Sequence, residues 1–143
     1  MLVSPSISFH SESITFSLEN KDDVVAWIKE AISAENKTLG EVSYIFCSDE
    51  YLYKINLEHL NHDTYTDIIT FNYCEEDVLN ADIFISIDRV KENANTYNVG
   101  FETELHRVII HGILHLVGYN DKSDEQQKEM TSREDFYLSL RKF

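Results

Sequence analysis

The sequence is poor in cysteine and has no long apolar run. Its only cysteines, Cys47 and Cys74, lie far apart in apolar, strand-like stretches, which favours buried reduced thiols over a disulfide or a metal role. No run of 18 apolar residues occurs, so we expect no membrane-spanning segment. The first residues lack the basic and long apolar regions of a secretory signal. These absences together predict a cytoplasmic protein.

Basic residues are also scarce. Twelve Lys and Arg stand against 26 Asp and Glu, which gives a net charge of −14 and disfavours broad electrostatic binding to nucleic acid. The imbalance is uneven, because residues 1–104 hold 6 basic and 20 acidic side chains, whereas residues 105–143 hold 6 of each. The C-terminal part is therefore neutral.

The length of 143 residues predicts one domain, residues 1–143, large enough to bury a core without disulfides. Runs that are typical of strands, or of a hairpin in the first case, cover residues 6–18, 41–47, 66–73 and 81–87. Patterns typical of helices cover residues 22–35, 48–59, 88–98, 102–117 and 123–142. Ser48 and Asp88 are the expected caps of their helices. We expect an α+β domain, with a mixed sheet of about four strands packed with four or five helices.

A histidine pair lies on the most apolar of these helices. His111 and His115 are four residues apart, so they project from one face about 6 Å apart along the axis and can close on one divalent cation. Gly118 suits a left-handed helix end, and the resulting turn can carry Asp121 back toward the pair. Two histidines and a carboxylate, with a fourth position open to water, are typical of catalytic zinc. The alternative is that both histidines are hydrogen-bonded core residues.

A zinc ion with three protein ligands acidifies its bound water, so this site predicts hydrolysis. Gly112 stands where the protease motif His-Glu-x-x-His has its general base, which disfavours peptide hydrolysis. The missing Cβ of this glycine lets a substrate or another backbone approach closely. Cleavage of RNA needs less from the protein, since the RNA brings its own 2′-hydroxyl and a metal can stabilise charge on the phosphate.

Three cations near the site in sequence can assist this chemistry: Arg107, Lys122 and Arg133. The alternative for Arg107 is a salt bridge with Glu104, three residues earlier on the same helix face. The predicted catalytic residues are His111, His115 and Arg107.

Four other polar residues lie on or near these elements. His106 lies about 140° round the helix from His111 and should not share its metal. Asp67, in an apolar strand, is expected to bond loop amides or the second nitrogen of a ligand histidine. His59 and His62 can line a groove, although exposed loop histidines are the simpler interpretation.

Two blocks of sequence resemble a known family. Thr66-Asp67-Ile-Ile-Thr-Phe71, followed by Asp82-Ile-Phe-Ile-Ser86 and then by His111-Gly-x-Leu-His115-x-x-Gly118-Tyr119, resembles the YbeY family of bacterial rRNA-maturation endoribonucleases. The resemblance covers about residues 50–125. It implies a metal-dependent, single-strand-specific endoribonuclease that acts in 16S rRNA 3′-end processing and ribosome quality control. It also implies zinc bound by three histidines and a metalloprotease-like core of helix and sheet.

The chain departs from that family pattern at two positions. The third histidine of the family falls on Asp121, which can also bind zinc but leaves the site one unit less positive and can shift its preference toward a harder cation. The loop before the Thr-Asp strand usually carries an arginine thought to help catalysis. Aligning Asn56 and Asp63 puts Leu60 at that position, where it cannot hold a phosphate.

Three hypotheses follow from the sequence. The first is a zinc-dependent endoribonuclease acting on rRNA of the small ribosomal subunit. The second is a hydrolase of another substrate that uses the same metal-bound water. The third is a ribosome-assembly factor that binds RNA or a ribosomal protein, with a structural metal, and the absent arginine and net charge of −14 favour it. No DNA or membrane partner is expected.

Overall fold

The computed structural model describes residues 5–62 and 64–143, which form a four-stranded sheet with helices on both faces. The strand order is β1-β2-β4-β3, with β1 (Ser6–Glu12), β2 (Thr38–Cys47) and β4 (Val78–Ser86) parallel. The edge strand β3 (Ile68–Asn72) runs antiparallel to β4. This mixed sheet of four strands confirms the prediction.

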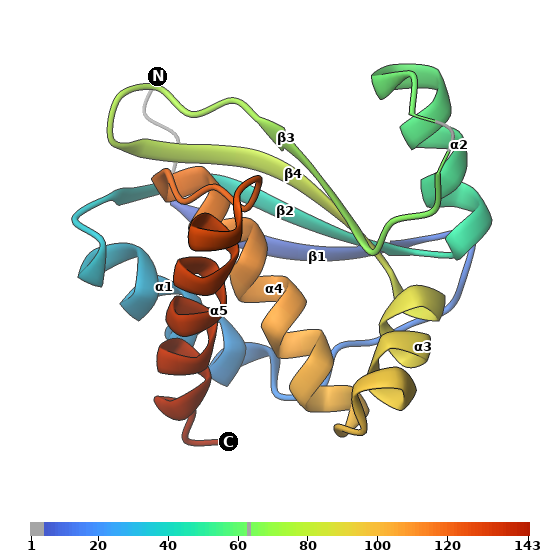
Figure 1. The fold of residues 1–143 in the computed structure, drawn as a ribbon. Coiled ribbons are helices and arrows are strands. Elements are labelled where there is room, and N and C mark those ends of the chain that lie inside the picture. The colour runs from blue at the N-terminus through green and yellow to red at the C-terminus, as the bar shows by residue number, and fades with distance from the viewer. Residues whose placement is uncertain (1–4, 63) are drawn as a thin grey trace.

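Five helices complete the fold of the described residues, as expected for the α+β class. They are α1 (Lys21–Ala34), α2 (Asp49–Leu60), α3 (Ile87–Tyr97), α4 (Phe101–Val117) and α5 (Asp124–Ser139). Figure 1 shows α1, α4 and α5 gathered on one side of the sheet, with α2 apart from them. Across residues 5–62 and 64–143, none of the helices combines the length and the apolar character needed to cross a bilayer.

The two faces of the sheet pack against different helices because side chains alternate along each strand. Ile83 and Ile85 of β4 belong to the main core, which they share with residues of α1, α4 and α5. Phe84, between them, packs with Leu52 of α2 and Ile69 of β3 in a smaller cluster on the other face. Cys47 and Cys74 are free thiols and form no disulfide. The large core therefore fixes α4, the helix with the histidine pair, against the sheet.

One predicted helix cap is confirmed and one is wrong. Ser48 caps α2, and its hydroxyl accepts a backbone N–H three residues later at 3.1 Å. The cap of α3 is Ser86 rather than Asp88, because the helix begins two residues earlier than expected. The Asp88 carboxylate instead accepts the backbone N–H of Asp49 at 2.9 Å and so ties the starts of α2 and α3 together.

The N-terminal strand is shorter than the predicted residues 6–18 and makes no hairpin. β1 pairs in parallel with β2, from Ser6 beside Glu41 to Glu12 beside Cys47. The chain then turns at Ser13, whose φ is 65°. The partner of β1 is distant in sequence, so the local alternation of residues could not distinguish this pairing from a hairpin.

Gly112 lets α4 lie close to the sheet. A Cβ at this position would stand 3.2 Å from the Cδ1 atoms of both Ile68 and Ile83, which is tighter than ordinary side-chain packing. The groups that approach this glycine are thus isoleucine side chains of the sheet rather than another backbone. The close contact holds the middle of α4 over β3 and β4.

His106 lies on a different side of α4 from the histidine pair. It is buried, and its ring contacts Trp27 and Phe143, with centroids 5.9 Å and 5.2 Å away. Arg141 donates a hydrogen bond to its Nδ1 at 2.7 Å, so the ring is neutral with its proton on Nε2. That Nε2 has the Glu102 carboxylate 3.6 Å away.

Burial of His106 should make stability depend on pH. Burial, together with the Arg141 charge, lowers the pKa of His106 from 6.5 to about 4. Between these two pKa values, unfolding is accompanied by uptake of a proton. The contribution of His106 to the free energy of unfolding is therefore present above pH 6.5 and is lost as the pH falls toward 4. In denaturant titrations, the free energy of unfolding of the wild type should fall over this window by about 2 to 3 kcal/mol more than that of His106→Gln. The exposed His10→Gln variant should follow the wild type, and equal pH slopes for all three would contradict the prediction.

Candidate metal centre

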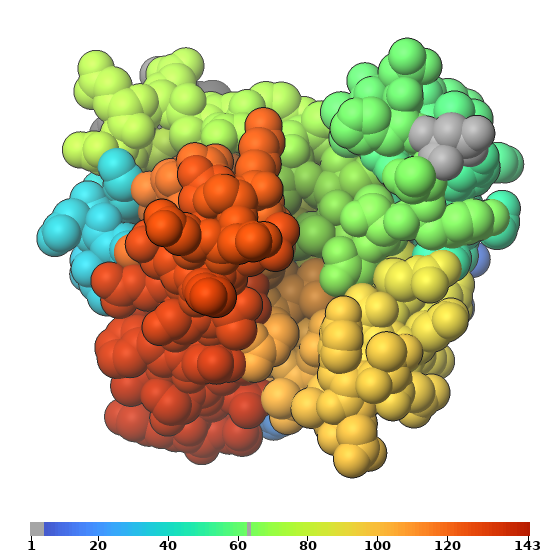
Figure 2. Space-filling view, viewed as in Figure 1, coloured from blue at the N-terminus to red at the C-terminus, as the bar shows by residue number. Residues whose placement is uncertain are grey.

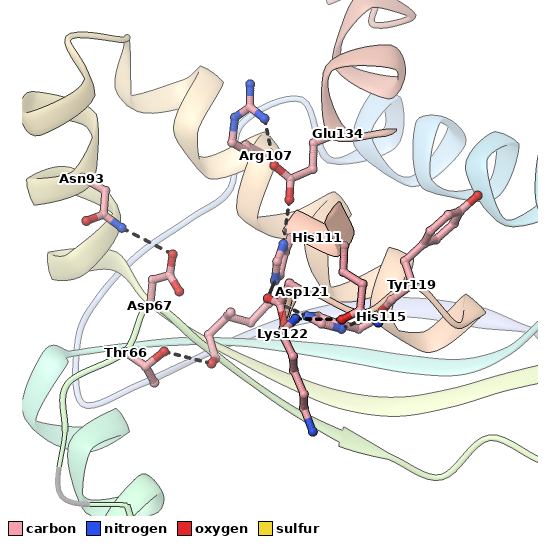
Figure 3. Close-up of polar contacts among 12 residues, drawn as sticks. Thr66, Asp67, Asn93, Arg107, His111, His115, Tyr119, Asp121, Lys122 and Glu134 are labelled. Atoms are coloured by element: carbon pink, nitrogen blue, oxygen red, sulfur yellow. Dashed lines mark hydrogen bonds and ion pairs between the residues drawn. The ribbon is translucent and has the colours of Figure 1, made fainter. Parts of the chain in front are cut away.

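The three predicted ligands lie together at the C-terminal end of α4. His111 and His115 share one face of the helix, and Gly118, with φ of 116°, turns the chain sharply after it. This turn brings Oδ2 of Asp121 to 3.5 Å from Nε2 of His111 and 3.3 Å from Nε2 of His115. Donor atoms of all three residues lie within 4.8 Å of one another, and Figure 3 shows them converging.

The second nitrogen of each ring is engaged elsewhere, and this fixes the tautomers. Nδ1 of His115 lies 3.0 Å from the backbone carbonyl of Tyr119, which can only accept a hydrogen bond, so Nδ1 carries the proton. Nδ1 of His111 lies 2.6 Å from the carboxylate of Glu134 and donates to it in the same way. In the neutral rings, both Nε2 atoms therefore keep a free lone pair on the side of Asp121.

This donor set fits a divalent metal. Two ligand atoms at about 2.0–2.1 Å from a tetrahedral zinc lie about 3.3 Å apart, close to the 3.5 Å and 3.3 Å between the Asp121 oxygen and the two ring nitrogens. Two imidazoles and one carboxylate supply the nitrogen and oxygen atoms that zinc accepts. His111, His115 and Asp121 can thus hold one ion and leave a further position open to the solvent.

Glu134 on α5 is a site residue that the sequence analysis missed. Its side chain is buried, and besides accepting from His111 it accepts from Nη1 of Arg107 at 2.8 Å. Burial lowers the pKa of His111, but the hydrogen bond and charge of Glu134, with the nearby Asp67, outweigh this effect and raise it overall. The only signal in the sequence was an acid on an amphipathic helix, which carries no information about contact with a histidine 23 residues earlier.

Arg107 forms ion pairs with α5 rather than the expected salt bridge with Glu104. Its Nη1 lies 2.8 Å from Glu134, and its Nη2 lies 2.6 Å from Asp135. Two carboxylates thus satisfy this guanidinium, which stands behind Glu134 as seen from His111 (Figure 3). The arrangement is a chain of contacts from arginine through carboxylate to imidazole.

Tyr119 anchors the turn that carries Asp121. Its hydroxyl donates to the Glu35 carboxylate at the end of α1 at 2.8 Å, and Tyr137 of α5 donates to the other oxygen of that carboxylate. The backbone carbonyl of Tyr119 meanwhile accepts from His115. One residue therefore ties the turn both to the fold and to a candidate ligand.

Asp67 lies beside the site but does not hold a ligand ring. Its carboxylate accepts a hydrogen bond from Nδ2 of Asn93 at 3.3 Å. Burial raises the pKa of Asp67, although the charge of His111 opposes that shift. Of the two alternatives given for Asp67, a bond to the second nitrogen of a ligand histidine is wrong, because Glu134 and the carbonyl of Tyr119 take those nitrogens.

Two cavities meet at the candidate metal centre. One, of about 770 Å³, runs along β3, and the other, of about 540 Å³, lies between α3, α4 and α5. Both are lined by Asp67, His111 and Asp121. Figure 2 shows the surface hollowed between α5 on one side and the β3 and α3 region on the other.

The loop before β3 contributes to the first of these cavities. Leu60, His62 and Lys122 line it. His62 is exposed, as the simpler interpretation expected, and it also lines this groove. His59 instead packs edge-on against Phe71. Leu60, which the sequence analysis aligned with the family arginine, is 41% exposed. Asp63, which was used to align this loop, lies outside the described residues.

Comparisons with known proteins agree on one family. A family model described as "Endoribonuclease YbeY" matches residues 6–141. A protein of that name from Flavobacterium johnsoniae is 52% identical over 134 residues, which cover 94% of this chain and 96% of the relative. Another, from Bacteroides fragilis, is 46% identical over 136 residues, 95% of this chain and 98% of the relative. A solution structure of a Thermotoga maritima protein superimposes with a TM-score of 0.66 and 31% identity, covering 94% of this chain and 87% of that one.

Removing the charge of Asp121 should weaken metal binding. Asp121→Asn keeps the size of the side chain but replaces an anionic ligand by a neutral amide, so zinc affinity should fall by about 10-fold or more. Competition with a chromogenic chelator measures this. Asp77→Asn, the same change at a carboxylate that is 72% exposed, is the control. Equal zinc affinity of Asp121→Asn and the wild type would show that this carboxylate is not a ligand.

Glu134 should affect metal affinity without touching the ion. Glu134→Gln retains an acceptor for His111 but loses the charge that favours its ligand orientation, so we expect about 10-fold weaker zinc binding in the same chelator competition. Asp135→Asn removes the neighbouring carboxylate, which pairs with Arg107 and makes no contact with His111, and should bind zinc as the wild type does. A similar loss in both variants would mean that only the ion pairs of Arg107 matter.

Proposed function

The chain belongs to the endoribonuclease YbeY family, and on this premise we propose that it is a zinc-dependent, single-strand-specific endoribonuclease. Its proposed substrate is the 3′ end of 16S rRNA in the small ribosomal subunit, and its proposed role is rRNA maturation and ribosome quality control in the cytoplasm. Residues 1–143 would act as one catalytic domain. The observation that carries this proposal is the group of His111, His115 and Asp121, with both ring tautomers fixed, where two cavities meet.

His111 and His115 would hold the zinc through Nε2, and Asp121 through Oδ2. When bound there, the ion supplies an acidified water and positive charge for the phosphate oxygens of the substrate. The hydrogen bonds of the two Nδ1 atoms keep the rings in their ligand orientation, so neither ring has to reorient before its Nε2 binds the ion.

We assign Arg107 a positioning role in this reaction. Its two ion pairs with Glu134 and Asp135 occupy the guanidinium that the sequence analysis placed among the catalytic residues. Arg107 then acts through Glu134 on the orientation of His111. Lys122 lines the cavity along β3 beside Asp121 and remains as a cation for a phosphate of the substrate. It can hold a phosphate, which Leu60 cannot.

Two observations favour the third hypothesis, a ribosome-assembly factor that binds RNA or a ribosomal protein. Leu60 lines the cavity at the position where the family usually has an arginine, and the chain carries a net charge of −14. Both features lower the expected affinity for a phosphate backbone. Cleavage and binding therefore have to be measured separately.

Cleavage of rRNA should depend on the metal ligands. With zinc-loaded protein and a fragment that contains the single-stranded 3′ end of 16S rRNA, His115→Ala should lose about 100-fold or more in rate, measured on denaturing gels. His10→Ala, which removes an exposed histidine of β1, is the control and should cleave as the wild type does. Asp121→His tests whether the carboxylate limits the site, and a faster rate would show that it does.

Binding of the same proteins to small ribosomal subunits distinguishes the two hypotheses. If the wild type cleaves neither this fragment nor a fully single-stranded RNA with zinc or manganese, and all variants bind subunits equally, the assembly-factor hypothesis holds and the nuclease proposal fails. Cleavage by the wild type with loss in His115→Ala supports the nuclease.

A further inference from the structure

The two cavities that meet at the metal centre differ in chemistry. The cavity along β3 is lined by the neutral polar side chains of Thr64, Thr70 and Asn72, together with the basic Lys122. Apart from the two carboxylates shared at the centre, the described residues that line it include no acid. Hydroxyl and amide groups beside an ammonium are donors to phosphate oxygens, so this cavity suits the backbone of a nucleic acid strand.

The cavity between α3, α4 and α5 has the opposite character. Besides the shared carboxylates, it is lined by Glu104 and Glu134. A phosphate placed there would face Glu104, which forms no ion pair among the described residues, while the Arg107 guanidinium is already paired with Glu134 and Asp135. A neutral group meets no such penalty. If one RNA strand passes over the metal centre, we therefore expect its phosphates in the β3 cavity and an uncharged part of the strand in the cavity between α3, α4 and α5.

An exposed aromatic ring stands in this acidic cavity. Tyr97, the last residue of α3, lines it and is 64% exposed, and Val99, which follows the helix, is 42% exposed beside it. The Tyr97 ring pairs with no other ring among the described residues that form aromatic contacts. By contrast, the exposed Tyr65 stacks on Tyr53, with centroids 4.6 Å apart, and lies under Arg89.

Tyr97 thus presents an aromatic face to a cavity that excludes phosphate, and the uncharged, flat part of a nucleotide is its base. Building on the proposed nuclease function, we infer that Tyr97 is the stacking platform for a nucleobase of single-stranded RNA next to the cleaved phosphate. The rest of the strand follows the β3 cavity. Stacking of this kind tolerates any base, because every base has a π-face, and it requires an unpaired base that can leave the stack of its neighbours. Tyr97 would then favour single strands without choosing a sequence.

The test compares Tyr97→Leu with Tyr97→Phe on a short single-stranded RNA. Leucine keeps the apolar bulk but removes the ring, so KM should rise about 10-fold with kcat unchanged, whereas phenylalanine keeps the ring and should match the wild type. Tyr73→Leu is the matched control, since Tyr73 is 57% exposed but lines neither cavity. Fluorescence anisotropy measures affinity for the same RNA before cleavage begins.

A second arm identifies the group that stacks. One base at a time is removed from the RNA on either side of the cleaved phosphate. With one of these abasic RNAs, the wild type and Tyr97→Leu should bind with the same weak affinity. If Tyr97→Leu binds and cleaves every RNA like the wild type, or if its loss persists with all abasic RNAs, the inference is wrong. If no protein cleaves but the affinity pattern holds, the nuclease proposal fails and the platform stands as a binding site.

Discussion

Two hydrogen bonds at the Nδ1 atoms of His111 and His115 determine which ring nitrogens are available to a metal ion. Histidine offers either nitrogen to a metal, and the choice depends on the partner of the other one. Here the Tyr119 carbonyl and the Glu134 carboxylate each take a proton from Nδ1, so the two Nε2 lone pairs face Asp121. Without those partners, the same helix would carry two histidines whose rings could turn toward solvent or core.

The fold supports these bonds from several sides. Gly112 brings α4 close to Ile68 and Ile83, so the helix cannot shift over the sheet without losing that contact. The Glu35 carboxylate at the end of α1 accepts a hydrogen bond from the Tyr119 hydroxyl, and Arg107 donates one to Glu134. The open side of the centre is left to the two cavities. Rigid support on one side and an open cleft on the other are what a hydrolytic metal site requires.

The acidity of the chain is compatible with an RNA substrate because it is distributed unevenly around the centre. Of the two cavities, the one along β3 holds the neutral polar groups and Lys122, and the one against α5 holds Glu104 and Glu134. An aromatic ring stands on the acidic side. A strand with charged phosphates and neutral bases can satisfy both sides at once.

The features that depend on local spacing could be predicted from the residues alone. The separation of four residues put His111 and His115 on one helix face, and Gly118 ended that helix so that Asp121 could return to them, because both effects act within one turn of chain. Most helices and strands followed from periodicity for the same reason. Three other features follow from the packing of whole elements: Glu134 contacts His111, Arg107 pairs with α5 rather than with Glu104, and β1 lies parallel to β2. Those contacts join residues from 23 to 35 positions apart, and their formation depends on how whole elements pack, which no local pattern of residues specifies.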